Sequence, residues 1–156
     1  MNLGLLLYIP YRAMESRVFA GLAAAGFDDI TPAQARVFQR IADGGSRLTD
    51  LAEAAQITKQ SAGFLVDQLE RAGYVERAPD PTDARARLVR VAPRGAAAIP
   101  VAAEIVAEVE REWAAHLGER RTSQLRQALT ALREITDPYR DDAGTLRDTP
   151  IPADRA

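Results

Sequence analysis

The sequence predicts a mainly α-helical protein with one small β-hairpin. Apolar residues recur at spacings of three to five through most of the 156 residues, which is the period of helices with one buried face. Between residues 74 and 91 this period gives way to two short apolar runs, separated by a polar stretch that contains two prolines. That pattern is typical of a hairpin. We therefore expect four helices, a hairpin and two further helices, in that order.

The first two helices are marked by apolar spacing and by a capping pattern. We expect a helix over residues 2–25, which Pro10 either kinks or effectively starts. Thr31 can cap a second helix that has Pro32 at its first position, and the side chain of Gln34 can reach back to the amide of the cap. This second helix should end at the glycine pair that follows it.

The next segment predicts two short helices joined by a tight connection. Thr49 can open the first, which ends at Ala55, and Thr58 can open the second, which runs to Gly73. One face of the second helix is apolar and should be buried: Ala62, Leu65, Val66 and Leu69. The opposite face should be exposed to solvent: Lys59, Gln60, Gly63, Phe64 and Asp67.

The hairpin strands are expected at residues 74–77 and 88–91, and a helix bent at Pro100 is expected over residues 94–117. Thr122 should open a last helix. Its apolar stripe should point inward: Leu125, Leu129, Leu132 and Ile135. Residues 141–156 contain almost no large apolar side chain, so we expect them to form a flexible tail.

The composition argues against several function classes. The chain has no cysteine, which removes disulfides, thiolate metal sites and cysteine nucleophiles. Its single histidine, His116, leaves little for a metal site or a catalytic triad. No glycine-rich loop has the spacing and the lysine of a phosphate-binding motif. We therefore expect no enzyme activity, no cofactor and no metal.

Charge and targeting signals are also informative. The net charge of −2 gives no overall attraction to nucleic acid or to anionic membranes. The apolar run at the N-terminus is shorter than the roughly 20 residues of a spanning helix and has no preceding basic residue. We expect a cytoplasmic protein without a membrane partner, and any binding of nucleic acid must depend on local charge.

The second helix of the central pair has the side chains of a DNA-reading helix. Its first turn carries Thr58, Lys59, Gln60 and Ser61, whose donors and acceptors can read base edges in a major groove. Gly63 would allow close approach to DNA, or it admits a neighbouring side chain. Phe64 would contact a thymine methyl group or pack against the hairpin, and packing is slightly favoured. A plain solvated face is the alternative for the whole stripe.

The hairpin supplies the local positive charge. After Asp83 the chain has four arginines and no acidic residue: Arg85, Arg87, Arg90 and Arg94. We expect these to contact phosphates, with an arginine at the tip entering a minor groove. The alternative is that they protect an edge strand and pair with Asp80 or Asp83.

These motifs together resemble the MarR family. The resemblance covers residues 31 to 95 and is carried by Leu51–Ala54, Thr58–Ser61, Leu65–Arg77 and Asp80–Arg85. It implies a mainly α protein with a small β-hairpin wing, that is, a winged helix-turn-helix flanked by long dimerisation helices. The implied domains are a dimerisation helix at 1–30, the DNA-binding domain at 31–95, dimerisation helices at 96–140 and the tail at 141–156.

The resemblance also implies site residues. The DNA recognition helix would use Thr58, Lys59, Gln60, Ser61, Gly63 and Phe64, and the wing would use Asp83, Arg85 and Arg87. Ala84 departs from the family, which often has a basic residue there, and Phe64 departs where the family often has a polar or basic one. Both departures affect the expected DNA preference.

The function implied is a homodimeric, sequence-specific DNA-binding repressor that reads a palindromic operator and is released by a small aromatic or phenolic ligand. An effector pocket could be lined by five aromatic residues, although dimer and domain core is the favoured interpretation of each: Tyr8, Tyr11, Phe19, Phe38 and Trp113. The alternative is a winged-helix protein-interaction module without DNA binding, which the acidic net charge and the neutral Ala84 favour.

Overall fold

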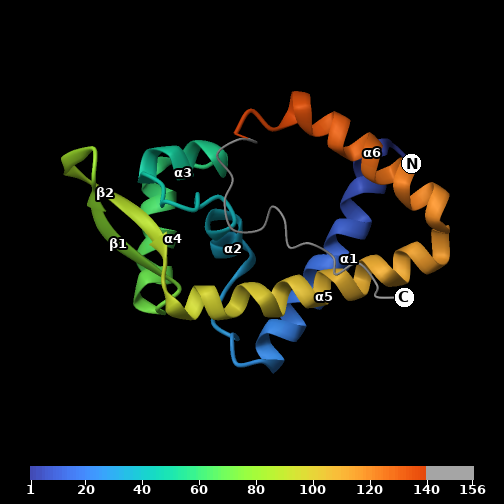
Figure 1. Ribbon diagram of the computed structural model, residues 1–156, viewed down its shortest axis with the longest axis horizontal. Coiled ribbons are helices and arrows are strands. Elements are labelled where there is room, and N and C mark those ends of the chain that lie inside the picture. The colour runs from blue at the N-terminus through green and yellow to red at the C-terminus, as the bar shows by residue number, and fades with distance from the viewer. Residues whose placement is uncertain (140–156) are drawn as a thin grey trace. The chain divides into compact units, whose positions relative to one another are not determined.

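The computed structural model describes residues 1–139, and within them it contains six helices and one two-stranded antiparallel sheet (Figure 1). The flexible tail expected at residues 141–156 lies outside the described residues. The chain divides into two compact units. One unit comprises residues 1–28 and 100–136. The other, which we call the reading head, comprises residues 29–99 and, within the described part, 137–139.

The reading head begins with α2 (Pro32–Phe38), whose capping was predicted from sequence. The hydroxyl oxygen of Thr31 accepts from the amide of Gln34 at 3.3 Å, and the side chain of Gln34 accepts from the amide of Thr31 at 2.8 Å. The helix ends earlier than expected. After Phe38 the chain turns so that Ile41 is completely buried in the core.

The central helix pair consists of α3 (Leu48–Ala54) and α4 (Lys59–Arg71). The expectation that Thr49 opens α3 was wrong: the cap position is Arg47, whose side chain makes no capping bond. The cap of α4 was predicted correctly, because the Thr58 hydroxyl oxygen accepts from the amide of Ser61 at 3.1 Å. Gly73, with a φ of 81°, then takes the left-handed conformation that glycine adopts readily.

The hairpin is longer than predicted. It consists of β1 (Val75–Asp80) and β2 (Asp83–Val91), so most of the stretch expected to be a polar loop is strand. The turn between the two strands therefore has only two residues, Pro81 and Thr82. The Asp80 carboxylate accepts from both the amide and the hydroxyl of Thr82, at 2.8 and 2.7 Å, and the ladder is irregular between Pro79 and Asp80. We call this hairpin, residues 75–91, the wing.

The core of the reading head lies between the helices and the wing. The side chains that are at most 2% exposed are Val37, Ile41, Leu51, Ala62, Val66, Leu69, Tyr74, Val75 and Val89. The expected core face of α4 is confirmed at Ala62, Val66 and Leu69, while Leu65 is half-buried. Ser46 pairs with Val89 through two backbone hydrogen bonds, which ties the segment before α3 to the wing.

The second unit contains α1 (Leu3–Ala24), α6 (Glu119–Thr136) and most of α5 (Pro93–Leu117). Pro10 and Pro100 lie inside continuous helices. The expectation that Thr122 opens the last helix was wrong. The helix starts at Glu119, and the Thr122 hydroxyl instead donates to the carbonyl of Gly118 at 3.0 Å. Across residues 1–139, no helix is both long and apolar enough to cross a membrane.

The apolar stripe of α6 is exposed in the single chain, contrary to expectation. The exposed fractions are Leu125 43%, Leu129 40%, Leu132 38% and Ile135 82%. The first turns of α1 are similarly exposed, and their large apolar side chains are Leu3, Leu5, Leu6, Leu7 and Ile9. The sequence period identified the apolar face correctly, but the single chain does not bury it.

Candidate nucleic-acid interface

The first turn of α4 and its cap present four polar side chains to solvent. The hydroxyls of Thr58 and Ser61 are used within the cap: Thr58 donates to the Ser61 hydroxyl at 2.9 Å and accepts from the Ser61 amide. Lys59 and Gln60 are exposed, and in residues 1–139 neither side chain has an ion pair or hydrogen bond. Lys59 and Gln60 therefore differ from Thr58 and Ser61, whose hydroxyls bond to each other.

Gly63 follows on the same helix, and the interior of the protein does not require a glycine there. A Cβ at this position would lie 3.6 Å from Cδ2 of Leu48, which is an ordinary van der Waals distance. The interpretation that Gly63 makes room for a neighbouring side chain is therefore wrong. Glycine inside a helix destabilises it by about 1 kcal/mol relative to alanine. Packing inside the protein therefore does not explain why this position is a glycine.

Phe64 lies on the outer surface of α4. Its side chain is 62% exposed, so the slight preference for packing against the wing was wrong. Asp67, the next residue of the stripe, has a partner instead. Its carboxylate forms an ion pair with Arg77 of β1 at 2.6 Å, and the amide of Arg77 donates to Glu70 at 3.1 Å. These contacts fix the wing to α4 and compensate the acidic charge on the outer surface of the helix.

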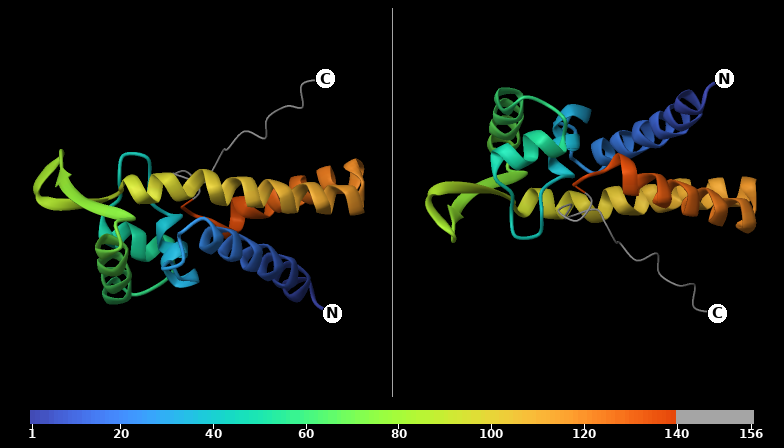
Figure 2. Two further views of the ribbon diagram at one scale, coloured as in Figure 1. Left: turned by 90° about the horizontal axis from the view of Figure 1, so that it is seen from below. Right: turned by 90° about the horizontal axis from the view of Figure 1, so that it is seen from above.

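The tip of the wing carries unpaired positive charge. Arg85 and Arg87 are exposed, and within residues 1–139 neither guanidinium group forms an ion pair. The turn of the wing stands clear of α3 and α4 in all three views (Figures 1 and 2). Asp83, expected to act with Arg85, is the first residue of β2: its carboxylate accepts from the amide of Arg85 at 3.0 Å and lies 3.9 Å from the guanidinium group of Arg47.

The other two arginines of the expected phosphate surface hold the fold together. Arg90 donates to the carbonyl of Gly44 at 3.1 Å. Arg94 forms an ion pair with Asp29 at 2.7 Å and lies over the ring of Tyr74, 4.6 Å from its centre. The hydrogen bond from the Tyr74 hydroxyl, followed by the contacts with Arg94, lowers the pKa of Asp29. Of the four arginines expected to contact phosphates, Arg85 and Arg87 are therefore the two whose side chains make no contact of this kind within residues 1–139, and the phosphate contact itself stays a prediction.

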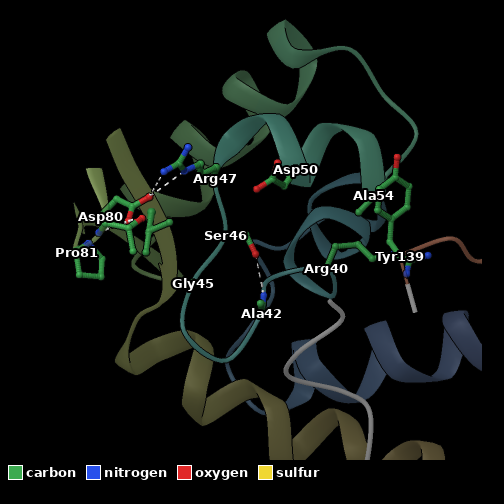
Figure 3. Close-up of a pocket in the computed structure, with 12 residues that line it drawn as sticks. Arg40, Ala42, Gly45, Ser46, Arg47, Asp50, Ala54, Asp80, Pro81 and Tyr139 are labelled. Atoms are coloured by element: carbon green, nitrogen blue, oxygen red, sulfur yellow. Dashed lines mark hydrogen bonds and ion pairs between the residues drawn. The ribbon is translucent and has the colours of Figure 1, made fainter. Parts of the chain in front are cut away.

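A contact that the sequence did not reveal anchors this tip. The Asp80 carboxylate, 6% exposed, accepts from Nε and Nη2 of Arg47 at 2.8 and 2.7 Å (Figure 3). The hydrogen bonds from Thr82, together with those from Arg47, lower the pKa of Asp80 to about 2. The alternative in which Asp80 pairs with a wing arginine was wrong. The Asp-Pro-Thr turn was visible in the sequence, but no local pattern indicated a partner 33 positions upstream.

A cavity of about 400 Å³ lies beside this anchor. Figure 3 shows Arg47, Asp80 and Pro81 on one side of it and Arg40 and Tyr139 on the other. The second side is held by the ion pair between Arg40 and Asp137 at 3.2 Å. None of the five aromatic residues expected to bind an effector lines this cavity.

Those five aromatic residues lie in two different units of the structure. Tyr8 and Tyr11 are exposed, Phe19 and Trp113 are half-buried, and Phe38 is buried in the reading head. The hydroxyl of Tyr11 donates a hydrogen bond to the carboxylate of Glu15 at 3.0 Å. The effector pocket therefore stays a prediction.

Two crossing helices followed by a hairpin with a charged tip define the reading head as a winged helix-turn-helix. A model of the MarR family matches residues 28–86. This match confirms the resemblance seen in the sequence, and it places the winged helix-turn-helix segment of the chain in the MarR family.

Solved structures share the fold over nearly their whole length. The transcriptional regulator PA4135 is 26% identical, with 86% of this chain and 98% of that chain covered and a TM-score of 0.67. Transcriptional regulator Tm0710 from Thermotoga maritima is 25% identical, with 88% and 96% covered and a TM-score of 0.61. A variant of MepR from S. aureus, bound to an oligodeoxyribonucleotide, is 22% identical, with 87% and 99% covered and a TM-score of 0.57. No curated sequence matches this chain at a significant level.

The chain thus has the fold of the MarR-family transcriptional regulators, mainly helical with a small β-hairpin wing. Both PA4135 and Tm0710 are named as transcriptional regulators.

Proposed function

We propose that this protein is a homodimeric, sequence-specific DNA-binding repressor of transcription that acts in the cytoplasm. The observation that carries the proposal is a set of four exposed side chains without a partner in the described part of the chain: Arg85 and Arg87 at the wing tip, and Lys59 and Gln60 on α4. In a chain of net charge −2, positive charge this concentrated marks a local surface for an anionic partner. The DNA complex of the MepR variant, which has the same fold, supports the choice of DNA.

The chemistry of α4 suits base reading in the major groove. The amide of a glutamine such as Gln60 can bond both N6 and N7 of adenine, and a lysine such as Lys59 can reach O6 and N7 of guanine or a phosphate. The arginines at the wing tip suit the narrow minor groove over A·T-rich sequence, where the negative potential is strongest. In this proposal α4 supplies specificity, and the wing supplies affinity.

The proposed dimer accounts for the exposed apolar faces of the terminal helices. Large apolar side chains are exposed along both helices, and a cluster of such side chains is typical of an interaction surface. We propose that a second copy of the chain covers the stripes of α1 and α6, including Leu129 and Leu132. A symmetric dimer would read a palindromic operator whose half-sites lie about 10 base pairs, one helical turn, apart.

Release by a small aromatic or phenolic ligand is the regulatory part of the proposal. Its support is the set of exposed or half-buried aromatic side chains on α1 and α5, which belong to one unit: Tyr8, Tyr11, Phe19 and Trp113. A ligand can release DNA only if it binds more tightly to the form that does not hold DNA. Phenol and benzoate are suitable first probes, and the expected result is weaker DNA binding in their presence.

The test is a salt titration of binding to the DNA upstream of the protein's own gene, followed by fluorescence anisotropy. Each phosphate contact contributes about 0.9 to the slope of log affinity against log salt. Arg85→Ala and Arg87→Ala should each weaken binding, and in a dimer each should reduce the slope by about 2. Arg111→Ala, which removes an exposed arginine from α5, is the matched control and should leave the slope unchanged. Wild-type slopes for both wing variants would refute the wing assignment.

The alternative is a winged-helix module that binds protein without binding DNA. The exposed Phe64, the neutral Ala84 at the wing tip and the acidic net charge favour it. Failure of the wild-type protein to bind any DNA at low salt would support this alternative over the repressor.

A further inference from the structure

The reading head exposes one large hydrophobic side chain among its described residues, 29–99 and 137–139. That side chain is Phe64, at 62% exposure. The other exposed large apolar side chains of residues 1–139 lie at the N-terminus, on α1 and on α6. Phe64 is therefore an isolated apolar group on a surface whose other free side chains are polar or positively charged, and it is not part of the apolar faces of the terminal helices.

The position of Phe64 on α4 places it within the proposed base-reading surface. It follows Gln60 by four residues, so the two side chains are neighbours on one face of the helix. Gly63 precedes it and carries no side chain that would hold the helix away from a ligand. The ion pair between Asp67 and Arg77 fixes the next turn of the helix, so the backbone that carries Phe64 is anchored to the wing.

We propose that Phe64 recognises thymine, by contact of its ring with the thymine 5-methyl group in the major groove. This inference rests on the proposed DNA binding and names one feature of the operator. The 5-methyl group is the apolar feature of the base-pair edges in that groove. Beside it, Gln60 carries the amide that suits adenine. A cytosine in place of the thymine has no 5-methyl group, so the ring of Phe64 would lose its apolar contact.

The experiment uses thymine analogues in a duplex chosen by the protein. Wild-type protein selects a duplex from a random-sequence pool, and each thymidine of the enriched duplex is then replaced in turn by deoxyuridine. Deoxyuridine pairs as thymidine does and lacks only the methyl group. We expect a loss of affinity of about fourfold at one position in each half-site, the effect of exposing one methyl-sized group.

Variants then assign the contact to Phe64. Phe64→Ala should bind the thymidine duplex more weakly and show no further loss at the sensitive position, because the methyl group has no partner to lose. Arg87→Ala is the control. The fold loss of affinity caused by this variant and the fold loss caused by deoxyuridine should multiply, because the two contacts are independent. Phe64 and Arg87 are both exposed, so both variants should fold as the wild type does. Equal midpoints of thermal unfolding for the two variants and the wild type verify this.

Two results would overturn the inference while leaving DNA binding intact. One is a wild-type protein that tolerates deoxyuridine at every position, or that selects a duplex without thymine. The other is a Phe64→Ala variant that still loses affinity at the sensitive position. If the wild-type protein enriches no duplex at all, the proposed function fails and the inference fails with it.

Discussion

Replacement of Gly63 by alanine should make the protein more stable and a weaker DNA binder. The added Cβ would lie 3.6 Å from Cδ2 of Leu48, an ordinary contact, so the fold accepts it without displacement. Alanine also favours the helix by about 1 kcal/mol relative to glycine. The free energy of unfolding should therefore rise by about 0.5–1 kcal/mol, which corresponds to roughly 1–4 °C in Tm.

The expected effect of Gly63→Ala on DNA has the opposite sign. If the backbone of α4 approaches the bases closely at this position, the methyl group overpacks that contact. Overpacking in a well-packed region costs about 1–3 kcal/mol, which corresponds to about a fivefold to 150-fold loss of affinity. The assays are chemical denaturation without DNA and anisotropy with the duplex that the wild-type protein selects.

The two assays separate the possible errors. A variant that is stabilised and binds DNA as tightly as wild type would show that α4 does not approach DNA at Gly63. A variant that is destabilised would show that the environment of Gly63 inside the protein has been misjudged, since the 3.6 Å contact with Leu48 predicts no clash.

The remaining predictions concern the anchor of the wing and the core beneath it. Asp80→Asn should lower the free energy of unfolding at neutral pH. Because the pKa of Asp80 in the folded protein, about 2, is below the unfolded value near 3.9, the difference from wild type should shrink as the pH falls from about 4 toward 2. Denaturation across this pH range tests it, and a difference that is independent of pH would contradict it. Gly95→Ala should destabilise by about 1–3 kcal/mol or more, because its Cβ would lie 2.3 Å from the carbonyl oxygen of Tyr74 and 2.8 Å from Cε2 of Phe38. Urea denaturation measures the free energy of unfolding. A value equal to that of the wild type would contradict the prediction and would show that the backbone at Tyr74, just before β1, moves aside.

Features set by neighbouring residues could be predicted from the sequence. The capping box at Thr31 and the cap of α4 at Thr58 depend on side chains three positions apart, so their signals are local. The ends of the strands were harder to place. Pro79 and Asp80 resemble loop residues, but the carboxylate of Asp80 closes a tight turn and lets pairing extend to it.

Features set by distant residues could not be predicted. The partner of Asp80 is Arg47, 33 positions earlier, and the sequence contains no pattern that links them. The same limit applies to the apolar stripe of α6, which was expected to point inward. A helical period shows that a face is apolar, as at Leu129, but it does not show whether the same chain covers that face.

For the candidate site, the helix and the hairpin that the sequence singled out are present as α4 and the wing, but the sequence did not reveal the contacts that each residue makes within the fold. Four arginines were expected to contact phosphates, and contacts within the fold occupy Arg90 and Arg94. Phe64 was expected to pack against the wing and is exposed. In each case the deciding factor is the geometry of the folded chain, which composition and spacing do not contain.

The most direct test of the account is the DNA sequence that the protein chooses from a random pool. Selection is carried out in parallel with the wild-type protein and with a variant that combines Arg85→Ala and Arg87→Ala. The account predicts that the wild-type protein enriches an inverted repeat with half-site centres about 10 base pairs apart, and that the variant enriches it poorly at the same ionic strength. A wild-type protein that enriches no sequence at low salt, or a variant that enriches the repeat equally well, would contradict it.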